Sequence, residues 1–140
     1  MLFGRRERII NRILIVEDEP LVAFDNEHFL RGEGFEIVAT VDSVPGALGA
    51  IGDGVDLVLA DVNLSDGGNG RDVASAAKAQ RVPLIFVTGA CPVDAQALAV
   101  GCLAKPYSQR DLLGAINTVE AKLAGRVPKR VPRSFTLFGG

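Results

Sequence analysis

Short, largely apolar runs alternate with stretches of helical periodicity along this chain. The runs fit strands buried on both faces of a sheet, and they cover residues 12–16, 35–41, 56–60, 83–88 and 102–104. Between them, apolar residues recur every three or four positions. This spacing predicts helices over roughly residues 20–31, 44–51, 70–80, 93–100 and 109–123. Ser43 and Ser108 stand where they would cap the second and the last of these helices.

The alternation of five strands with five helices predicts an α/β fold with one doubly wound parallel sheet. A length of 140 residues is typical of one domain. We expect that domain over residues 12–124, after an N-terminal arm over residues 1–11. The basic, proline-containing segment 125–140 is predicted to be an irregular tail. In such sheets ligands bind beyond the carboxyl ends of the strands, so the residues that follow the strands are the candidates for chemistry.

Charged or hydroxyl side chains suited to chemistry stand at the ends of four predicted strands. Glu17 and Asp18 follow the first strand, and Asp61 follows the third. Thr88 ends the fourth strand, and Lys105 follows the fifth. Each residue alone is typical of a turn or a helix cap. Their joint occurrence at successive strand ends predicts one site at one edge of the sheet.

The acidic residues in this set need a positive partner. Two carboxylates about 4 Å apart repel by roughly 4 kcal/mol at an effective dielectric constant near 20. Protonation of one acid or a bound cation would offset this, and oxygen ligands favour a hard ion such as Mg²⁺. Lys105 and Thr88 are suited to binding phosphate, with further donors from backbone N–H groups near Asn63 and Gly89. A carboxylate can form an aspartyl-phosphate, and Asp61 is the best candidate because it follows the central strand.

Composition narrows the classes of function. The net charge of −2, with 48% hydrophobic and 23% charged residues, is that of an ordinary globular protein and does not point to DNA. Cys91 and Cys102, with His28 as the one histidine, cannot build a zinc site. We expect both cysteines to be buried, reduced thiols. The absence of a signal peptide and of any apolar run of about 18 residues favours a cytoplasmic protein without a membrane segment.

The motifs "ILIVEDEP", "DLVLADVNLSDGGNG", "PLIFVTGA" and "LAKPYSQRDLL" together resemble a response-regulator receiver domain of two-component signalling, over roughly residues 12–124. The resemblance implies a flavodoxin-like or CheY-like sheet of order 2-1-3-4-5. It implies Asp61 as the phosphoacceptor, with Thr88 and Lys105 sensing the phosphoryl group. The implied Mg²⁺ ligands are Glu17, Asp18, Asp61 and the backbone carbonyl of Asn63. The implied phosphodonor is a histidine on a sensor histidine kinase or a histidine phosphotransfer protein.

Two features depart from the usual receiver pattern. The family usually has an aromatic switch residue three positions before the lysine, where this chain has Cys102. The stretch "FVTGA" resembles the FAT GUY subgroup, which consists mostly of stand-alone receivers of alphaproteobacteria. Val87 nevertheless replaces the typical alanine, and the usual nearby tyrosine is missing. The switching route is therefore expected to differ from that of common receivers.

These observations predict a single-domain response regulator that is not an enzyme, because about 16 residues after the last predicted helix leave no room for an output domain. We expect it to act through phospho-dependent contact with an effector protein, or as a phosphate sink or feedback regulator of a kinase. The FAT GUY resemblance points by analogy to general stress signalling. The alternatives are a phosphate-independent binding module and a Mg²⁺-dependent phosphohydrolase. The second lacks a further acid directly after Asp61.

Overall fold

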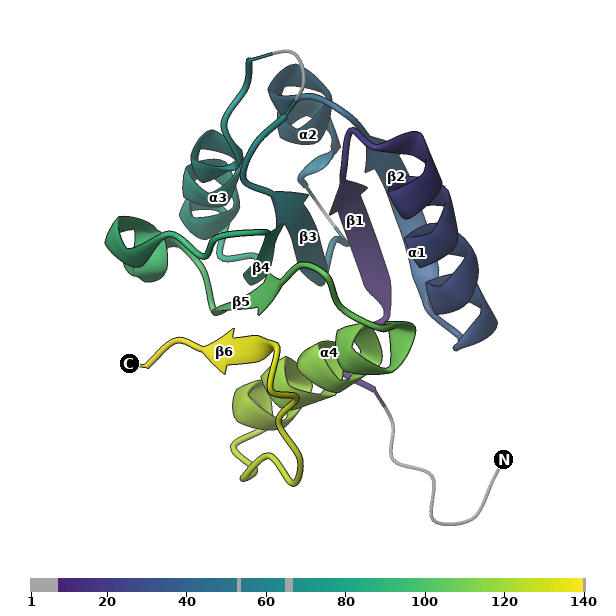
Figure 1. Cartoon of the computed structure of the whole chain (residues 1–140), viewed down its shortest axis with the longest axis vertical. Helices are drawn as coiled ribbons and strands as arrows, with labels where there is room; N and C mark the ends of the chain where they lie inside the picture. Colours follow the sequence, from purple (N-terminus) through teal and green to yellow (C-terminus); the bar gives the residue numbers. More distant parts are fainter. Residues whose placement is uncertain (1–7, 53, 65–66, 140) are drawn as a thin grey trace.

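Six strands form one sheet in the order β2-β1-β3-β4-β5-β6 (Figure 1). The computed structural model describes residues 8–52, 54–64 and 67–139. The parallel strands are β1 (Arg12–Val16), β2 (Glu36–Val41), β3 (Leu57–Asp61), β4 (Leu84–Thr88) and β5 (Gly101–Ala104). The short strand β6 (Phe135–Leu137) pairs antiparallel with β5. The predicted order 2-1-3-4-5 is confirmed, and a sixth strand is added to it.

Helices cover both faces of the sheet. They are α1 (Pro20–Gly32), α2 (Val44–Ala50), α3 (Gly70–Ala79), the 3₁₀ helix η1 (Val93–Leu98) and α4 (Gln109–Leu123). One core contains buried residues of α2, α3 and η1, and the other contains buried residues of α1 and α4, so the helices form two layers around the sheet (Figure 1). In the described part of the chain, no helix has the length and apolar character needed to cross a membrane.

The parallel strands are apolar throughout most of their length because each one contributes side chains to both cores. In β1, Leu14 and Val16 belong to the core under α2 and α3, whereas Ile13 and Ile15 belong to the core under α1 and α4. Successive side chains of a strand point to opposite faces, so a strand covered on both sides must be apolar at every position. The same holds for β3 and β4, in which every residue is buried and all but the terminal Asp61 and Thr88 are apolar.

The two predicted helix caps are present. The Ser43 side chain accepts a hydrogen bond from the backbone N–H of Gly46, and the Ser108 side chain accepts one from the N–H of Asp111. These bonds satisfy N–H groups that a helix leaves unpaired in its first turn. The Asp111 carboxylate does not complete a capping box but accepts a hydrogen bond from the Ser134 hydroxyl at 2.8 Å. The start of α4 thereby holds the returning C-terminal segment.

The prediction of an irregular tail is wrong for the segment that forms β6. Leu137 and Phe135 pair with Gly101 and Leu103 of β5. Phe135 and Phe138 are buried, one in each core. Gly101 permits this approach, because a side chain there would overlap the Phe135 ring. The prolines and cations that suggested disorder lie before the strand, where the chain crosses α4, and β6 covers what would otherwise be an open sheet edge.

The cysteines also differ from expectation. Cys91, in the loop after β4, is joined to Cys102 of β5 by a disulfide, and the protein has no free cysteine. We predicted two reduced thiols. The sequence places these residues 11 positions apart without showing that η1 folds the intervening segment back over β5. Their pairing is a consequence of this tertiary contact.

The described part of the N-terminal arm packs against the domain. Ile10 is fully buried, and the Arg8 guanidinium forms an ion pair with the buried Glu120 while lying over the Phe35 ring. Glu120 also accepts hydrogen bonds from the backbone N–H groups of Ile9 and Ile10. This carboxylate therefore fixes the entry of the chain into β1. Residues 1–7 of the predicted arm lie outside the described residues.

Replacing Phe135 with alanine should lower the free energy of unfolding by about 3 kcal/mol, because a large aromatic side chain leaves a packed core. The measurement is urea denaturation followed by circular dichroism. Thr136→Ala is the matched control, since Thr136 lies in the same strand but is exposed, and its effect should stay within about 0.5 kcal/mol. Equal, small losses for both variants would show that β6 does not stabilise the sheet.

Candidate functional site

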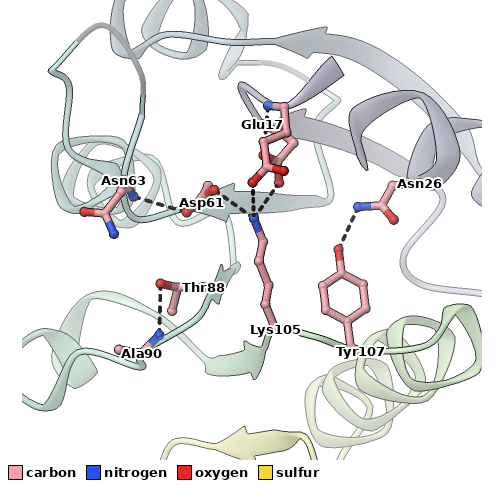
Figure 2. A network of polar contacts seen from close by, with 9 residues as sticks. Glu17, Asn26, Asp61, Asn63, Thr88, Ala90, Lys105 and Tyr107 are labelled. Carbon is pink, nitrogen blue, oxygen red and sulfur yellow. Dashed lines mark hydrogen bonds and ion pairs between the residues drawn. The ribbon is translucent and has the colours of Figure 1, made fainter. Parts of the chain in front are cut away.

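The carboxyl ends of the parallel strands bring the predicted residues to one edge of the sheet (Figure 2). Glu17 directly follows β1, Asp61 is the last residue of β3, and Thr88 is the last residue of β4. Lys105 follows β5. Glu17, Asp61 and Thr88 are each less than a tenth exposed. This juxtaposition follows from the parallel topology, in which every strand ends on the same side.

The Lys105 amine lies among three carboxylates. Its Nζ is 3.0 Å from Asp61 Oδ2 and 3.2 Å from Glu17 Oε1, and it is 3.6 Å from Glu19 Oε1. Burial alone would lower the pKa of Lys105, but its hydrogen bonds to Asp61 and Glu17 and their charges raise the pKa well above its usual range. These contacts therefore favour the charged form of the lysine among the acids of the cluster.

Glu17 is the most buried of these acids, with 5% of its surface exposed. Burial raises the pKa of its carboxyl, while the Glu19 backbone N–H and the Lys105 charge counteract part of this rise. Its own N–H donates to the Val41 carbonyl oxygen at 2.9 Å, which ties the end of β1 to the end of β2. The Glu17 carboxylate thus points into the site from a rigid strand end (Figure 2). One lysine leaves the group of acids with excess negative charge that a further cation would balance.

The acids provide the oxygen ligands that a hard cation prefers. One carboxylate oxygen from each of Glu17, Glu19 and Asp61 lies within 4.8 Å of the others. Such a donor set, without sulfur or imidazole, fits Mg²⁺. Glu19 was not selected from the sequence because it follows the strand end by three residues. Asp18 lies outside this group and is partly exposed, so its role as a metal ligand stays a prediction.

The segment after Asp61 turns back toward the Asp61 side chain. The Asn63 backbone N–H donates to Asp61 Oδ1 at 3.1 Å, while Lys105 binds the other carboxylate oxygen (Figure 2). The Asp61 carboxylate is thereby held at both oxygens. This places the Asn63 backbone next to the candidate metal position, and the role of the Asn63 carbonyl as a ligand stays a prediction.

Gly70 is a site-forming residue that the sequence analysis placed at the start of the helix over residues 70–80 without assigning it a role in the site. A side chain here would overlap the Asp61 carbonyl oxygen and come within 2.8 Å of the Val62 Cα. The Gly70 N–H donates to the Val62 carbonyl oxygen at 2.6 Å. The first residue of α3 is therefore pressed against the backbone of the candidate acceptor. The available sequence signal was a glycine directly after the helix-capping Asn69.

Thr88 pairs with Ala104, the residue before Lys105, but makes no hydrogen bond to Asp61 in the described structure. Its hydroxyl oxygen accepts a long hydrogen bond, 3.4 Å, from the Ala90 backbone N–H (Figure 2). The Lys105 N–H donates to the Thr88 carbonyl oxygen at 2.8 Å. The backbones of the two residues are thus coupled, while the Thr88 hydroxyl is engaged with the loop that follows it.

A groove of about 500 Å³ opens beside the amine of Lys105, between α1 and the start of α4. Its lining includes Glu19, Val22, Asn26 and Tyr107. The Asn26 side chain donates to the Tyr107 hydroxyl at 2.8 Å, and burial raises the pKa of that hydroxyl. This pair was not predicted from the sequence, since its partners lie 81 residues apart. It forms one wall of the approach to the acidic cluster.

Residues 13–117 match the family of response regulator receiver domains. The chain belongs to this family. Members act as phosphoryl-controlled signalling modules of two-component systems, and the site at the strand ends lies within the matched segment. The resemblance drawn from the motifs is confirmed, as is the α/β fold of the receiver type.

Curated relatives include regulators from several bacteria. The phyllosphere-induced regulator PhyR of Methylorubrum extorquens is 38% identical over 79 residues, which cover 54% of this chain and 30% of that protein. The sensory transduction protein RegX3 of Mycobacterium tuberculosis is 39% identical over 114 residues, covering 76% of this chain and 49% of that protein. The chain thus spans half or less of the length of these two relatives.

Solved structures support the same fold. A CheY-like receiver domain protein from Methanospirillum hungatei JF-1 superposes with a TM-score of 0.73 at 26% identity, over 83% of this chain and 98% of that one. SdrG from Sphingomonas melonis Fr1 gives a TM-score of 0.66 at 37% identity, over 76% and 93%.

Gly70→Ala should destabilise the protein by about 1–3 kcal/mol, because its side chain has no space beside the Asp61 backbone. Helix propensity alone would favour alanine by up to about 1 kcal/mol. Gly49→Ala is the matched control, since Gly49 lies in α2 with nothing near its Cβ position. Chemical denaturation of both variants distinguishes the two effects. A stabilised Gly70→Ala variant would contradict the close contact.

Mg²⁺ should stabilise the folded protein, by about 1.4 kcal/mol when its concentration is ten times Kd. The measurement is the melting temperature during a Mg²⁺ titration at constant ionic strength. Glu17→Gln should lose most of this shift, because it removes a buried carboxylate from the cluster. Glu33→Gln, a change at an exposed acid outside the site, should retain it. An equal Mg²⁺ response in both variants would exclude Glu17 as a ligand.

Proposed function

We propose that this protein accepts a phosphoryl group on Asp61 from a histidine of a sensor histidine kinase or a histidine phosphotransfer protein. One observation carries the proposal. The Asp61 carboxylate stands at the end of the central strand β3, with one oxygen 3.0 Å from Lys105 Nζ and the other 3.1 Å from the Asn63 N–H. A buried carboxylate held in this way is oriented as a nucleophile and has a positive charge beside it.

In the proposed reaction, an oxygen of Asp61 attacks phosphorus, and the bond from phosphorus to the donor nitrogen breaks. Bound Mg²⁺ would neutralise negative charge on the phosphoryl oxygens and on the acids. We propose Glu17, Asp18, Asp61 and the Asn63 carbonyl as its ligands, and the Glu17–Glu19–Asp61 cluster supports an acidic metal site at this edge. The Lys105 amine would move toward the transferred phosphoryl group, because the flexible lysine side chain can reach from the Asp61 carboxylate to a phosphoryl oxygen.

The phosphoryl group would change the site electrostatically. It adds about −1.5 to −2 charges at neutral pH, which attracts the Lys105 amine and offers an acceptor to the Thr88 hydroxyl. The hydroxyl can donate while it still accepts from the Ala90 N–H, so its turn toward the phosphoryl group would draw the attached loop with it. Movement of this loop would then alter the surface formed by η1 and β5, and so bias binding toward one partner.

Apolar residues exposed on α1 form a candidate docking surface for the phosphodonor protein. Leu21 and Phe24 are 79% and 65% exposed. They lie on the helix that forms one wall of the groove beside Lys105. Exposed large apolar side chains beside a reactive site are typical of a protein-binding surface. A partner seated there would have its histidine close to Asp61.

We further propose that the protein acts as a single-domain regulator, either by contacting an effector when phosphorylated or by draining phosphate from a shared kinase. The match over 93% of the solved SdrG chain supports a functional unit of this size. The similarity to PhyR agrees with the FAT GUY pattern, and on this analogy we place the protein in general stress signalling.

The experiment is the intact mass of the protein after incubation with acetyl phosphate and Mg²⁺. We expect a gain of one phosphoryl group, which Asp61→Asn and removal of Mg²⁺ both abolish. Asp42→Asn is the matched control, because this exposed acid follows β2 at the same edge of the sheet, and its labelling should equal that of the unaltered chain. If neither acetyl phosphate nor a panel of histidine kinases labels Asp61, the phosphate-independent binding module is the better description.

A further inference from the structure

The disulfide lies beside both candidate phosphoryl-binding residues. Cys91 follows Thr88 by three positions, and Cys102 precedes Lys105 by three. Thr88 pairs with Ala104 in the β4–β5 ladder, so the bridge and the strand pairing enclose a short ring of backbone. The segment from Thr88 to Cys91 is thereby attached to β5 at both of its ends. This attachment restrains the loop whose Ala90 N–H donates to the Thr88 hydroxyl oxygen, and so limits how far that loop can follow a turn of the Thr88 side chain.

The two sulfurs have different surroundings. Cys102 is fully buried in the core that contains Phe86, Ala95 and Phe138, whereas Cys91 is partly exposed next to the exposed residues Gly89 and Ala90. A reductant in solution therefore reaches the bridge from the Cys91 side, through the loop that carries Thr88.

We propose that Cys91 and Cys102 are a reversible redox modification site, at which a dithiol reductant releases the Thr88 loop; this inference rests on the function proposed for Asp61. A thiolate of the reductant attacks the Cys91 sulfur, the bond between the two cysteine sulfurs breaks, and the Cys102 thiolate takes up a proton. The second reductant thiol then displaces Cys91, which is also protonated. Two electrons and two protons pass to the protein, and the dithiol becomes a disulfide.

The redox state of the cysteine pair sets how far the loop after Thr88 can move. In the oxidised protein, residues 89–92 are held against β5, and the Thr88 hydroxyl stays with the loop. In the reduced protein, the same segment is attached only through the backbone and through the packing of η1. Phosphorylation of Asp61 then shifts the loop in the reduced form alone. The change in the partner-binding surface would then require both a phosphoryl group on Asp61 and a reduced cysteine pair. Phosphorylation of Asp61 by itself would not be sufficient.

The first measurement needs no phosphorylation. The protein is purified without reductant and divided, one half is treated with dithiothreitol, and both are alkylated and weighed intact. We expect no adduct before reduction and two after it. Hydrogen exchange of the segment 89–98 should be about tenfold faster or more in the reduced form, while exchange in α1, remote from the bridge, stays unchanged. Two adducts without reductant, even after incubation with oxidised glutathione, would overturn the proposal, as would equal exchange in the two forms.

The second measurement tests the link to the phosphorylation site. Acetyl phosphate and Mg²⁺ are added to both forms, and hydrogen exchange of the segment 89–98 is compared before and after labelling. We expect a phosphorylation-dependent change only in the reduced form. Cys91→Ser should behave as the reduced form under oxidising conditions, and Cys102→Ala is a second variant without the bridge. The matched control Ser43→Ala, at a cap remote from the bridge, should keep the redox dependence.

The outcomes separate this inference from the function it rests on. An equal phosphorylation-dependent change in both redox forms would overturn the redox control and leave Asp61 as the acceptor. A lack of labelling in both forms would overturn the proposed function and with it the control, by the cysteines, of the loop's response to phosphorylation. A phosphorylation-dependent change in hydrogen exchange that occurs only in the reduced form, and also in Cys91→Ser, would support both the redox control and the function proposed for Asp61.

Discussion

The contact of the Lys105 amine with Glu17 and Asp61 is the interaction on which the site depends. The three groups stand at the ends of β1, β3 and β5. None of them is stable in this position alone. A buried carboxylate without a partner costs several kcal/mol, and two of them repel each other as well. The lysine lowers both costs, although burial of its own charge opposes this effect. The parallel sheet can therefore hold acids at its edge only while a positive charge remains among them.

This balance also explains how the site can respond to a ligand. The lysine is bound to carboxylates by charge and hydrogen bonds, without the fixed geometry of a metal centre or a two-pronged arginine pair. A new anion beside Asp61 competes for the same amine. Because the Lys105 N–H is bonded to the Thr88 carbonyl, any displacement at the end of β5 reaches the end of β4. The fold thus couples two strand ends through a backbone contact as well as through the phosphoryl-binding side chains.

The environment of β5 distinguishes this molecule from a bare five-stranded receiver sheet. On one side its edge is covered by β6, with Phe135 against Gly101. On its face, Cys102 is joined to the loop after β4. Both contacts restrain the strand that leads into Lys105. The strand that would transmit a signal is consequently restrained on two sides, which is where the proposed release step would act.

The sequence by itself determined the parallel sheet, its strand order and the family, and it predicted Asp61, Glu17 and Lys105 at one edge. The parallel sheet and the meeting of these residues follow from local patterns, because apolar runs mark buried strands and the residues after them must meet at the carboxyl edge. The strand order and the family were implied by the resemblance of the motifs to receiver domains. Only the tertiary structure decided the contacts of Glu19, Gly70, Phe135 and the cysteine pair. Each depends on a close approach between segments far apart in the chain or on the exact path of a loop. No local pattern encodes such an approach, since the free energy that favours it appears only when both surfaces are already in place.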